Sequence, residues 1–186
     1  MSEEENWEEW WGGLIQGMEQ SFGACDEEAL PAAIPFSVGQ DLGGCPDVVT
    51  FSKYIEGALY VTVDLTDSEQ PANADGNYEL AIAHEGEEQW GVDFICQLAF
   101  DTLDKPINDG DILDTSLDMP EDSTIDGFIF RRIAKFDVLG HPCSVLCCVG
   151  ITESELKFCQ ENGSAKLIEK LGSDYIVTDL HRESRI

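Results

Sequence analysis

The stretch HPCSVLCCVGIT, residues 141–152, holds three of the seven cysteines and one of the three histidines of the chain. Thiols and an imidazole this close together could hold a metal ion, carry redox chemistry or pair a nucleophile with its base. In a β-strand, however, Cys147 and Cys148 point to opposite faces, so the two cannot ligate one metal ion without breaking the strand. The apolar residues on both faces instead predict a buried central strand in which the thiols fill space.

His141 and Cys143 are close enough in sequence to be considered as a base and a nucleophile. Pro142 separates them in an expected turn, and nothing nearby offers an orienting group or an oxyanion donor. The sequence also lacks the motifs of zinc sites, α/β-hydrolases, P-loop proteins and dinucleotide-binding proteins. We therefore predict no catalytic residue, no metal and no cofactor, and expect that the chain is not an enzyme. The competing hypothesis is a thiol-dependent enzyme or redox sensor that uses Cys143, Cys147 or Cys148.

The acidic loop DKPINDGDILDTSLDMPEDSTID, residues 104–126, raises the question of a calcium site, since hard cations bind several carboxylates. Aligning Gly110 with the invariant glycine of a calcium-binding loop places Lys105 and Ile107 where acidic ligands are required. Aligning Gly76 instead leaves an isoleucine where the bidentate glutamate is required. Neither loop is therefore expected to bind calcium in this way.

The formal net charge of −28 is unevenly distributed along the 186 residues. Residues 1–130 hold 30 acidic residues against two basic ones, whereas residues 131–186 hold eight of each sign. Such a negative field repels nucleic acids and anionic membranes and accelerates encounters with basic proteins. We therefore predict a basic protein partner, no nucleic acid and no membrane. The competing explanation is that the acidity serves only solubility, for example in a salty cytoplasm.

The hydrophobic pattern predicts one domain over residues 1–186, an α/β chain of the α+β kind. The expected helices are an acidic amphipathic helix over 1–24, one over 90–103, one from the capping box Thr152–Glu155 to Asn162, and a short one capped by Ser164. The expected strands cover 58–65, 77–84, 128–138, 144–151 and 175–180. The first two of these strands are expected to pair antiparallel.

The N-terminal sequence MSEEENWEEWW is acidic where a secretory signal is basic. No apolar run approaches the ~20 residues of a membrane-spanning helix. These two absences predict a cytoplasmic protein. Seven cysteines, an odd number without regular spacing, are then expected to be reduced thiols rather than a disulfide framework.

Several segments spread over residues 43–185 carry a family resemblance. They are GGCPDVVTFSKY (43–54), LYVTVDLTD (59–67), YELAI (78–82), the stretch from Trp90 to INDGD (90–111), and VGITESELKFCQENGSAKLIEKL followed by IVTDLHRES (149–184). In this order they are similar to the GG-PD---S-Y stretch, two strands, the helix with its glycine-acid turn, and the closing VG-T-EEL…NG…LLE-L…-TD--R pattern of the suppressor of fused domain family.

The resemblance implies a domain with a mixed, mainly antiparallel β-sheet packed with helices, which binds protein and catalyses nothing. The family's animal member restrains a transcription factor by clamping an extended peptide of it. Microbial members occur alone, and some are proposed to be immunity proteins that neutralise a toxin. Because the chain stops at Ile186, just past the matched segment, the resemblance favours the stand-alone microbial type.

The resemblance also points to binding residues. The family's bound peptide lies near the loop after the first strand, whose counterpart here is residues 64–75, and Asp67 and Asp75 match recognisably within it. Asp109 and Asp111 of the INDGD turn belong to the same predicted protein-binding set. A solvated turn acid is the competing interpretation of Asp67 and Asp75. The first hypothesis is a non-enzymatic, immunity-type inhibitor that binds a basic partner such as a toxin, and a general adaptor domain is an alternative.

Overall fold

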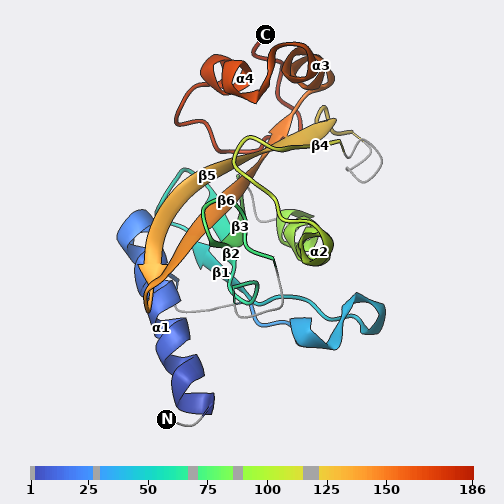
Figure 1. Cartoon of the computed structure of the whole chain (residues 1–186). Coiled ribbons are helices and arrows are strands. Elements are labelled where there is room, and N and C mark those ends of the chain that lie inside the picture. The colour runs from blue at the N-terminus through green and yellow to red at the C-terminus, as the bar shows by residue number, and fades with distance from the viewer. Residues whose placement is uncertain (1–2, 27–29, 67–70, 86–89, 115–121) are drawn as a thin grey trace.

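The two longest described strands, β5 (Gly127–Val138) and β6 (His141–Ile151), form a hairpin (Figure 1). The computed structural model describes residues 3–26, 30–66, 71–85, 90–114 and 122–186. These two strands pair antiparallel over nearly their whole length. Leu139 and Gly140 make the turn, with φ angles of 50° and 86°. Positive φ at both positions is typical of the tight hairpin turns that match the twist of the strands.

The expected turn over residues 139–142 is too long, because His141 and Pro142 belong to β6. Val138 and His141 close the tight turn as a hydrogen-bonded pair, so the next pair, Asp137 and Pro142, requires no N–H group from the proline. On its other side, β6 begins to pair with β3 (Asn77–His84) only at the following residue, Cys143. The strand therefore accommodates Pro142 without losing a hydrogen bond of the sheet.

Six strands form one mixed sheet in the order β1-β2-β3-β6-β5-β4. The other four strands are β1 (Val48–Phe51), β2 (Ala58–Thr62), β3 (Asn77–His84) and β4 (Ile112–Asp114). The predicted antiparallel pairing of residues 58–65 with 77–84 is confirmed, although β2 ends earlier than expected. Within the described strands, β3 and β6 pair in parallel and the other neighbours pair antiparallel.

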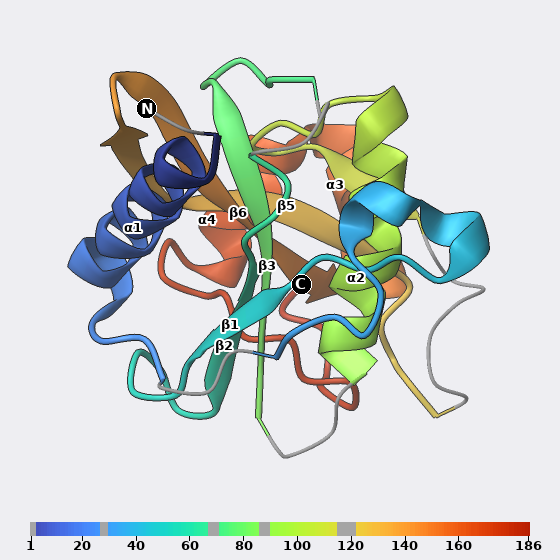
Figure 2. The same ribbon diagram turned by 90° about the horizontal axis from the view of Figure 1, so that it is seen from below.

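Helices cover both faces of the sheet. α1 (Glu3–Phe22) packs on β5, and α3 (Glu153–Asn162) and α4 (Ser164–Leu171) contribute to the same apolar cluster. α2 (Trp90–Asp104) packs on the opposite face. Figure 2 shows α1 and α2 on the two sides of the strands. In the described part of the chain, no helix combines the length and the apolar character that crossing a bilayer requires.

The side chains of β6 divide the core into two clusters. Cys143 and Cys147 lie in the cluster beneath α1, whereas Leu146 and Cys148 lie in the cluster beneath α2. All four side chains are fully buried. The prediction of a central strand buried on both faces is therefore confirmed.

A glycine lets α1 approach β5 closely. A Cβ atom at Gly17 would lie 2.3 Å from the ring of Phe136, so an alanine there would push the helix and strand apart. Leu14 and Met18 of α1 are fully buried, so the apolar face of the predicted amphipathic helix packs against the sheet. Trp7, in the first turns of the same helix, is 49% exposed.

The expected strand over residues 175–180 is wrong. This segment forms only an isolated parallel bridge between Ala83 and Val177. The pairing of β6 with β3 ends at Ile82 and Cys148, and Thr178 bridges the two strands just beyond that pair. Its N–H donates to the carbonyl of Ala83 at 2.7 Å, and its hydroxyl accepts from the N–H of Gly150 at 2.8 Å. Because these bonds come from one residue, the segment binds the sheet without becoming a strand.

The capping box at the start of α3 is confirmed, with reciprocal hydrogen bonds between Thr152 and Glu155. The expected Ser164 cap of α4 is wrong, because Gly163 both ends α3 and precedes the first residue of α4. Gly163 has a φ of 90°, a conformation that favours glycine and that reverses the chain between the two helices.

Candidate functional site

The buried thiols of β6 lie in surroundings that keep them protonated. Burial raises the pKa of Cys143 to about 11 and that of Cys147 to about 12, and it raises the pKa of Cys148 well above its ordinary value. His141 lies at the exposed end of the strand, where its ring contacts that of Trp10 at a centroid distance of 5.7 Å. A buried thiol with a raised pKa supplies little nucleophilic thiolate, so these cysteines act as apolar packing groups.

Two loops that carry predicted binding residues meet beside β5. One is residues 71–76, which lead into β3, and the other is residues 105–111, which follow α2. The side-chain amide of Asn73 donates to the carbonyl of Ile107 at 3.0 Å, and the N–H of Ala74 donates to Oδ1 of Asn108 at 3.1 Å. These bonds place Asp75 next to the turn that contains Asp109 and Asp111, although the loops are far apart in sequence.

Asp75 forms ion pairs with two cations of β5. Its carboxylate contacts the guanidinium of Arg132, and its Oδ1 accepts from Nζ of Lys135 at 2.9 Å. The hydrogen bonds from Lys135 and Arg132 lower the pKa of Asp75 below its ordinary value. The Asp75 side chain is 21% exposed and that of Lys135 is 54% exposed, so water and an approaching partner both reach the pair.

Asp109 and Asp111 are exposed, and each uses an oxygen to order the loop. Oδ1 of Asp109 accepts from the N–H of Arg132 at 2.9 Å, and Oδ2 of Asp111 accepts from the N–H of Asn108 at 2.9 Å. Asp75 therefore contacts the side chain of Arg132, and Asp109 contacts the backbone of the same residue. Within the described residues, no group of three His, Cys, Asp or Glu side chains is placed to hold a metal ion.

Arg132 and Lys135 were missed by the sequence analysis. Both lie in the part of the chain whose charges cancel, and only the basic pattern FRRIAK within a strand could have drawn attention to them. Asp67 lies outside the described residues, so its place in this cluster stays a prediction. We refer to Asp75, Asp109, Arg132 and Lys135 as the charged cluster.

The outer edge of β5 is covered over only its first half. β4 pairs with β5 from Gly127 to Ile129, and the 109–111 turn then hydrogen-bonds to Phe130 and Arg132. From residue 133 to residue 138, no described strand or loop hydrogen-bonds to this edge. We refer to residues 133–138 as the open edge.

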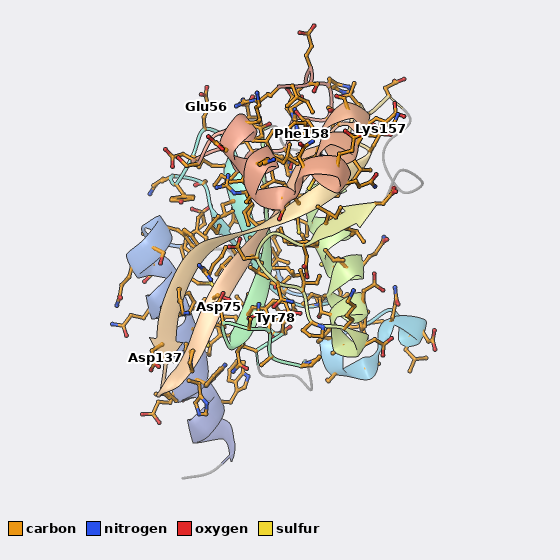
Figure 3. All side chains as sticks on the ribbon, turned by 45° about the horizontal axis from the view of Figure 1, so that its top comes forward. Glu56, Asp75, Tyr78, Asp137, Lys157 and Phe158 are labelled. Carbon is orange, nitrogen blue, oxygen red and sulfur yellow. The ribbon has the colours of Figure 1, made fainter. Side chains whose placement is uncertain are left out.

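The hairpin register determines which backbone groups of the open edge point outward. Phe136 and Val138 are hydrogen-bonded partners of β6, so the N–H and C=O groups of Lys135 and Asp137 point away from it. Figure 3 shows Asp75 at the middle of the hairpin and Asp137 near its tip. The charged cluster therefore lies along an unpaired strand edge, which is a template for another extended chain.

The carboxylate of Glu79, inside the core, accepts hydrogen bonds from the start of the loop that follows β2. Glu79 is fully buried, and its carboxylate accepts from the hydroxyl of Thr62 at 2.6 Å and from the N–H of Thr66 at 2.9 Å. Burial raises the pKa of Glu79 from 4.5 to about 7, even though these hydrogen bonds oppose the shift. In the sequence, Glu79 stands out only as the lone acidic residue of the predicted strand that contains YELAI.

A cavity of about 330 Å³ lies between α2 and β4, next to the 105–111 loop. Its apolar lining includes Leu98, Ile107, Leu113 and Phe130, and Asp111 also faces it. Asp111 thus borders this cavity, while Asp75 and Asp109 border the open edge. The three predicted residues that the structure describes therefore border two neighbouring features, the cavity and the open edge.

Comparisons with known proteins agree on one family. The family described as suppressor of fused protein (SUFU) matches residues 46–183. Among curated protein sequences, none matches the chain. The chain resembles a structure from the Sufu–Fu complex, with a TM-score of 0.73, 12% identity, and coverage of 95% of this chain and 92% of that one.

Two further solved structures share the fold. A suppressor of fused homologue from Neisseria gonorrhoeae FA 1090 gives a TM-score of 0.68 and 15% identity, over 96% of this chain and 98% of that one. Drosophila Suppressor of Fused gives 0.72 and 12% identity, over 95% of this chain and 51% of that one. At these identities the likeness concerns the fold, and it confirms the predicted α+β domain with a mixed sheet. Because the family match spans residues 46–183, this chain belongs to the suppressor of fused protein family.

Proposed function

We propose that this chain is a non-enzymatic protein-binding domain that holds an extended segment of a basic partner along the open edge. The observation that carries the proposal is the unpaired edge of β5 from residue 133 to residue 138 beside the charged cluster. Family membership supports a protein-binding role, and one solved relative was crystallised as the Sufu–Fu complex. The role that fits best is an immunity-type inhibitor that occludes a toxin.

Backbone pairing supplies the affinity in this mode of binding. A partner strand beside β5 would exchange hydrogen bonds with the outward N–H and C=O groups of Lys135 and Asp137. Side chains that alternate along that strand would provide specificity, since every second one faces the charged cluster. No chemical step is required of the domain, which agrees with the protonated state of the β6 thiols.

The charge of the chain supports a basic partner. The net charge of −28 attracts cationic proteins over a long range and raises their association rate. Toxins that act on nucleic acids tend to be basic because they bind phosphate, so an acidic blocker meets them quickly. Asp75 is suited to the final contact, because a lysine or arginine of the partner can replace Arg132 or Lys135 at its exposed carboxylate.

The experiment uses the product of a gene that neighbours this one. Co-expression is expected to rescue growth from a toxic neighbour, and titration of the purified toxin is expected to reach full inhibition at one equivalent. Lys135→Pro removes the outward N–H of the open edge, whereas the matched control Lys135→Ala removes the same ion pair and keeps the N–H. We expect the proline variant to bind at least tenfold more weakly than the alanine variant, measured by calorimetry.

Three outcomes would count against the proposal. Harmless neighbours, or toxicity that persists in the presence of this protein, would remove the inhibitor role. Inhibition by catalytic amounts of this protein would remove the non-enzymatic mechanism. Equal affinity of the proline and alanine variants would move the binding site away from the open edge.

An adaptor domain whose acidity serves only solubility is the second candidate. One observation favours it: Asp75, Asp109 and Asp111 all have hydrogen-bond partners within the domain itself. This function tolerates charge reversal at Asp109 and Asp111 without loss of any partner. The inhibitor function instead requires that the double reversal slow association with the toxin, and the slowing should diminish at high salt.

A further inference from the structure

Residues 31–47 form an arm that lies outside the sheet and beside α2. The arm contains two short 3₁₀ turns, η1 (Phe36–Val38) and η2 (Gln40–Leu42), which Figures 1 and 2 both place next to α2. Phe36 is buried against Phe100 of α2, with a ring centroid distance of 4.6 Å. Leu42 is 68% exposed. Packing against α2 therefore holds one side of the arm, while its other side faces water.

One cysteine of the arm lies next to a cysteine of the same helix. Cys45 belongs to the arm, and Cys96 lies on the buried face of α2. Sγ of Cys96 reaches the carbonyl of Pro46, the residue after Cys45, at 3.9 Å, and the two thiols lie close enough that each shifts the pKa of the other. Both side chains pack into the cluster beneath α2. From the sequence, all seven cysteines are expected to be reduced, and only the thiols of β6 are candidates for reactivity.

We propose that Cys45 and Cys96 are a modification site, at which a reversible disulfide fastens the arm to α2. The site is independent of the open edge and of partner binding there. It also differs in kind from the thiols of β6. Cys147 and Cys148 lie on opposite faces of their strand, and Cys143 and Cys147 are separated by about 13 Å along it. Opposite faces and a separation of this size prevent a disulfide, whereas Cys45 and Cys96 share one cluster and Cys96 already reaches the backbone next to Cys45.

The oxidant is a small-molecule disulfide such as oxidised glutathione. The Cys45 thiolate attacks one sulfur of the oxidant, which forms a mixed disulfide and releases one glutathione thiolate. The Cys96 thiolate then attacks the Cys45 sulfur, forms the internal disulfide and releases the second glutathione. The two protein thiols lose their two protons to solvent or to the released thiolates, and their two electrons reduce the oxidant to two thiols.

The environment assigns the two roles. Cys45 is half-buried and therefore accessible to the oxidant, whereas Cys96 is only 8% exposed and is therefore shielded from it. Burial raises the pKa of both thiols, but the hydrogen bond from Cys96 opposes this at Cys45 and stabilises its thiolate. Oxidation is consequently slow at neutral pH and accelerates as the pH rises, because only the thiolate attacks.

The disulfide would act on the arm rather than on the sheet. It closes a loop of about 50 residues, so it restricts the unfolded chain as well as the arm. The apolar side chains that the arm exposes, Ile34, Val38 and Leu42, would then be held in one orientation relative to α2. Oxidation is therefore expected to slow amide hydrogen exchange in residues 34–45 and to raise the urea midpoint of unfolding.

The test incubates the full chain with oxidised glutathione at pH 8.5 and then counts free thiols under denaturing conditions. We expect the count to fall from seven to five, the mass to drop by two hydrogen atoms, and peptide mapping to find the Cys45–Cys96 link. Cys96→Ser is expected to trap a glutathione adduct on Cys45, because the resolving thiol is gone. Cys25→Ser is the matched control, since Cys25 is also half-buried, and this variant should still form the disulfide.

Each alternative result overturns the proposal. Seven free thiols after oxidation would show that the contact does not lead to a bond. A disulfide that maps to other cysteines would place the modification elsewhere. A stable glutathione adduct on the unmodified chain would show that Cys96 cannot reach the Cys45 sulfur.

Discussion

Two carboxylate–arginine pairs in this domain differ in how far water reaches them. In the pair of Glu155 with Arg182, the side chains are 0% and 7% exposed. In the pair of Asp75 with Arg132, they are 21% and 35% exposed. The chemical groups are the same, and both pairs join segments that are distant in sequence. The two pairs therefore differ mainly in how far they are buried.

The buried pair belongs to a network of hydrogen bonds. Glu155 also accepts from the N–H groups of Thr152 and Arg185, and Arg182 donates to the carbonyl of Gly150. Burial by itself would raise the pKa of Glu155, but these hydrogen bonds, with that of Arg182 foremost, lower it. Removing one member leaves the other buried and uncompensated. Such a pair holds the C-terminal segment in place and is not available for exchange with a partner.

The exposed pair has the opposite property. Either Asp75 or Arg132 can return to water at little cost, because exposed ion pairs contribute little net stability. A partner residue can therefore replace one of them without unfolding the domain. Burial thus separates an ion pair that builds the fold from one that is available for binding.

The largest effect is expected for Arg182→Met. This change leaves the carboxylate of Glu155 buried without its cation and should lower the free energy of unfolding by about 3–5 kcal/mol. Urea denaturation measures it. Arg132→Met is the matched control on the exposed pair and should cost less than about 1 kcal/mol. Equal losses in the two variants would mean that burial does not distinguish the pairs.

The next effect concerns Glu79, a buried carboxylate that pairs with no cation among the described residues. Because its pKa is raised from 4.5 to about 7, the folded state binds more protons than the unfolded state between these values. The contribution of Glu79 to the free energy of unfolding is therefore fully present below pH 4.5. This contribution decreases by about 3 kcal/mol as the pH rises from 4.5 to about 7. Glu79→Gln should flatten the stability profile in this window. An unchanged slope would contradict the assignment.

Local features of the fold were predictable from the sequence. The capping box of Thr152 with Glu155 lies within one helical turn, and the alternation of Cys147 and Cys148 follows from strand geometry alone. The strand expected over residues 175–180 failed because β-propensity does not reveal whether an unpaired neighbour is available.

The candidate site was less predictable than the fold. Asp75 and Arg132 are separated by 57 residues, and they meet only because the parallel pairing of β3 with β6 brings the start of β3 beside the hairpin. No pattern in a single sequence encodes that pairing. The open edge was equally inaccessible, since it depends on where β4 ends relative to β5.

Asp75→Asn should separate stability from binding. The pKa of Asp75 is lowered by its cations, so its stabilising contribution is present above its ordinary value of 3.8 and is lost as the pH falls below it. At neutral pH we expect a loss below about 1 kcal/mol in urea denaturation. Affinity for a basic partner should fall by about five- to tenfold, measured by calorimetry. A stability loss as large as that of Arg182→Met would make Asp75 a structural residue.

The smallest effect is expected at the pair of Glu153 with Lys157 on α3, which extends the comparison to its exposed limit. The two side chains are 69% and 65% exposed and lie one helical turn apart. Their mutual hydrogen bond shifts both pKa values in the direction that favours the charged pair, yet water solvates each charge almost as well alone. Lys157→Ala should leave the urea midpoint unchanged at physiological salt. A measurable loss here would imply that exposure does not weaken ion pairs in this strongly acidic chain, and the exchange proposed for Asp75 would then lose its physical basis.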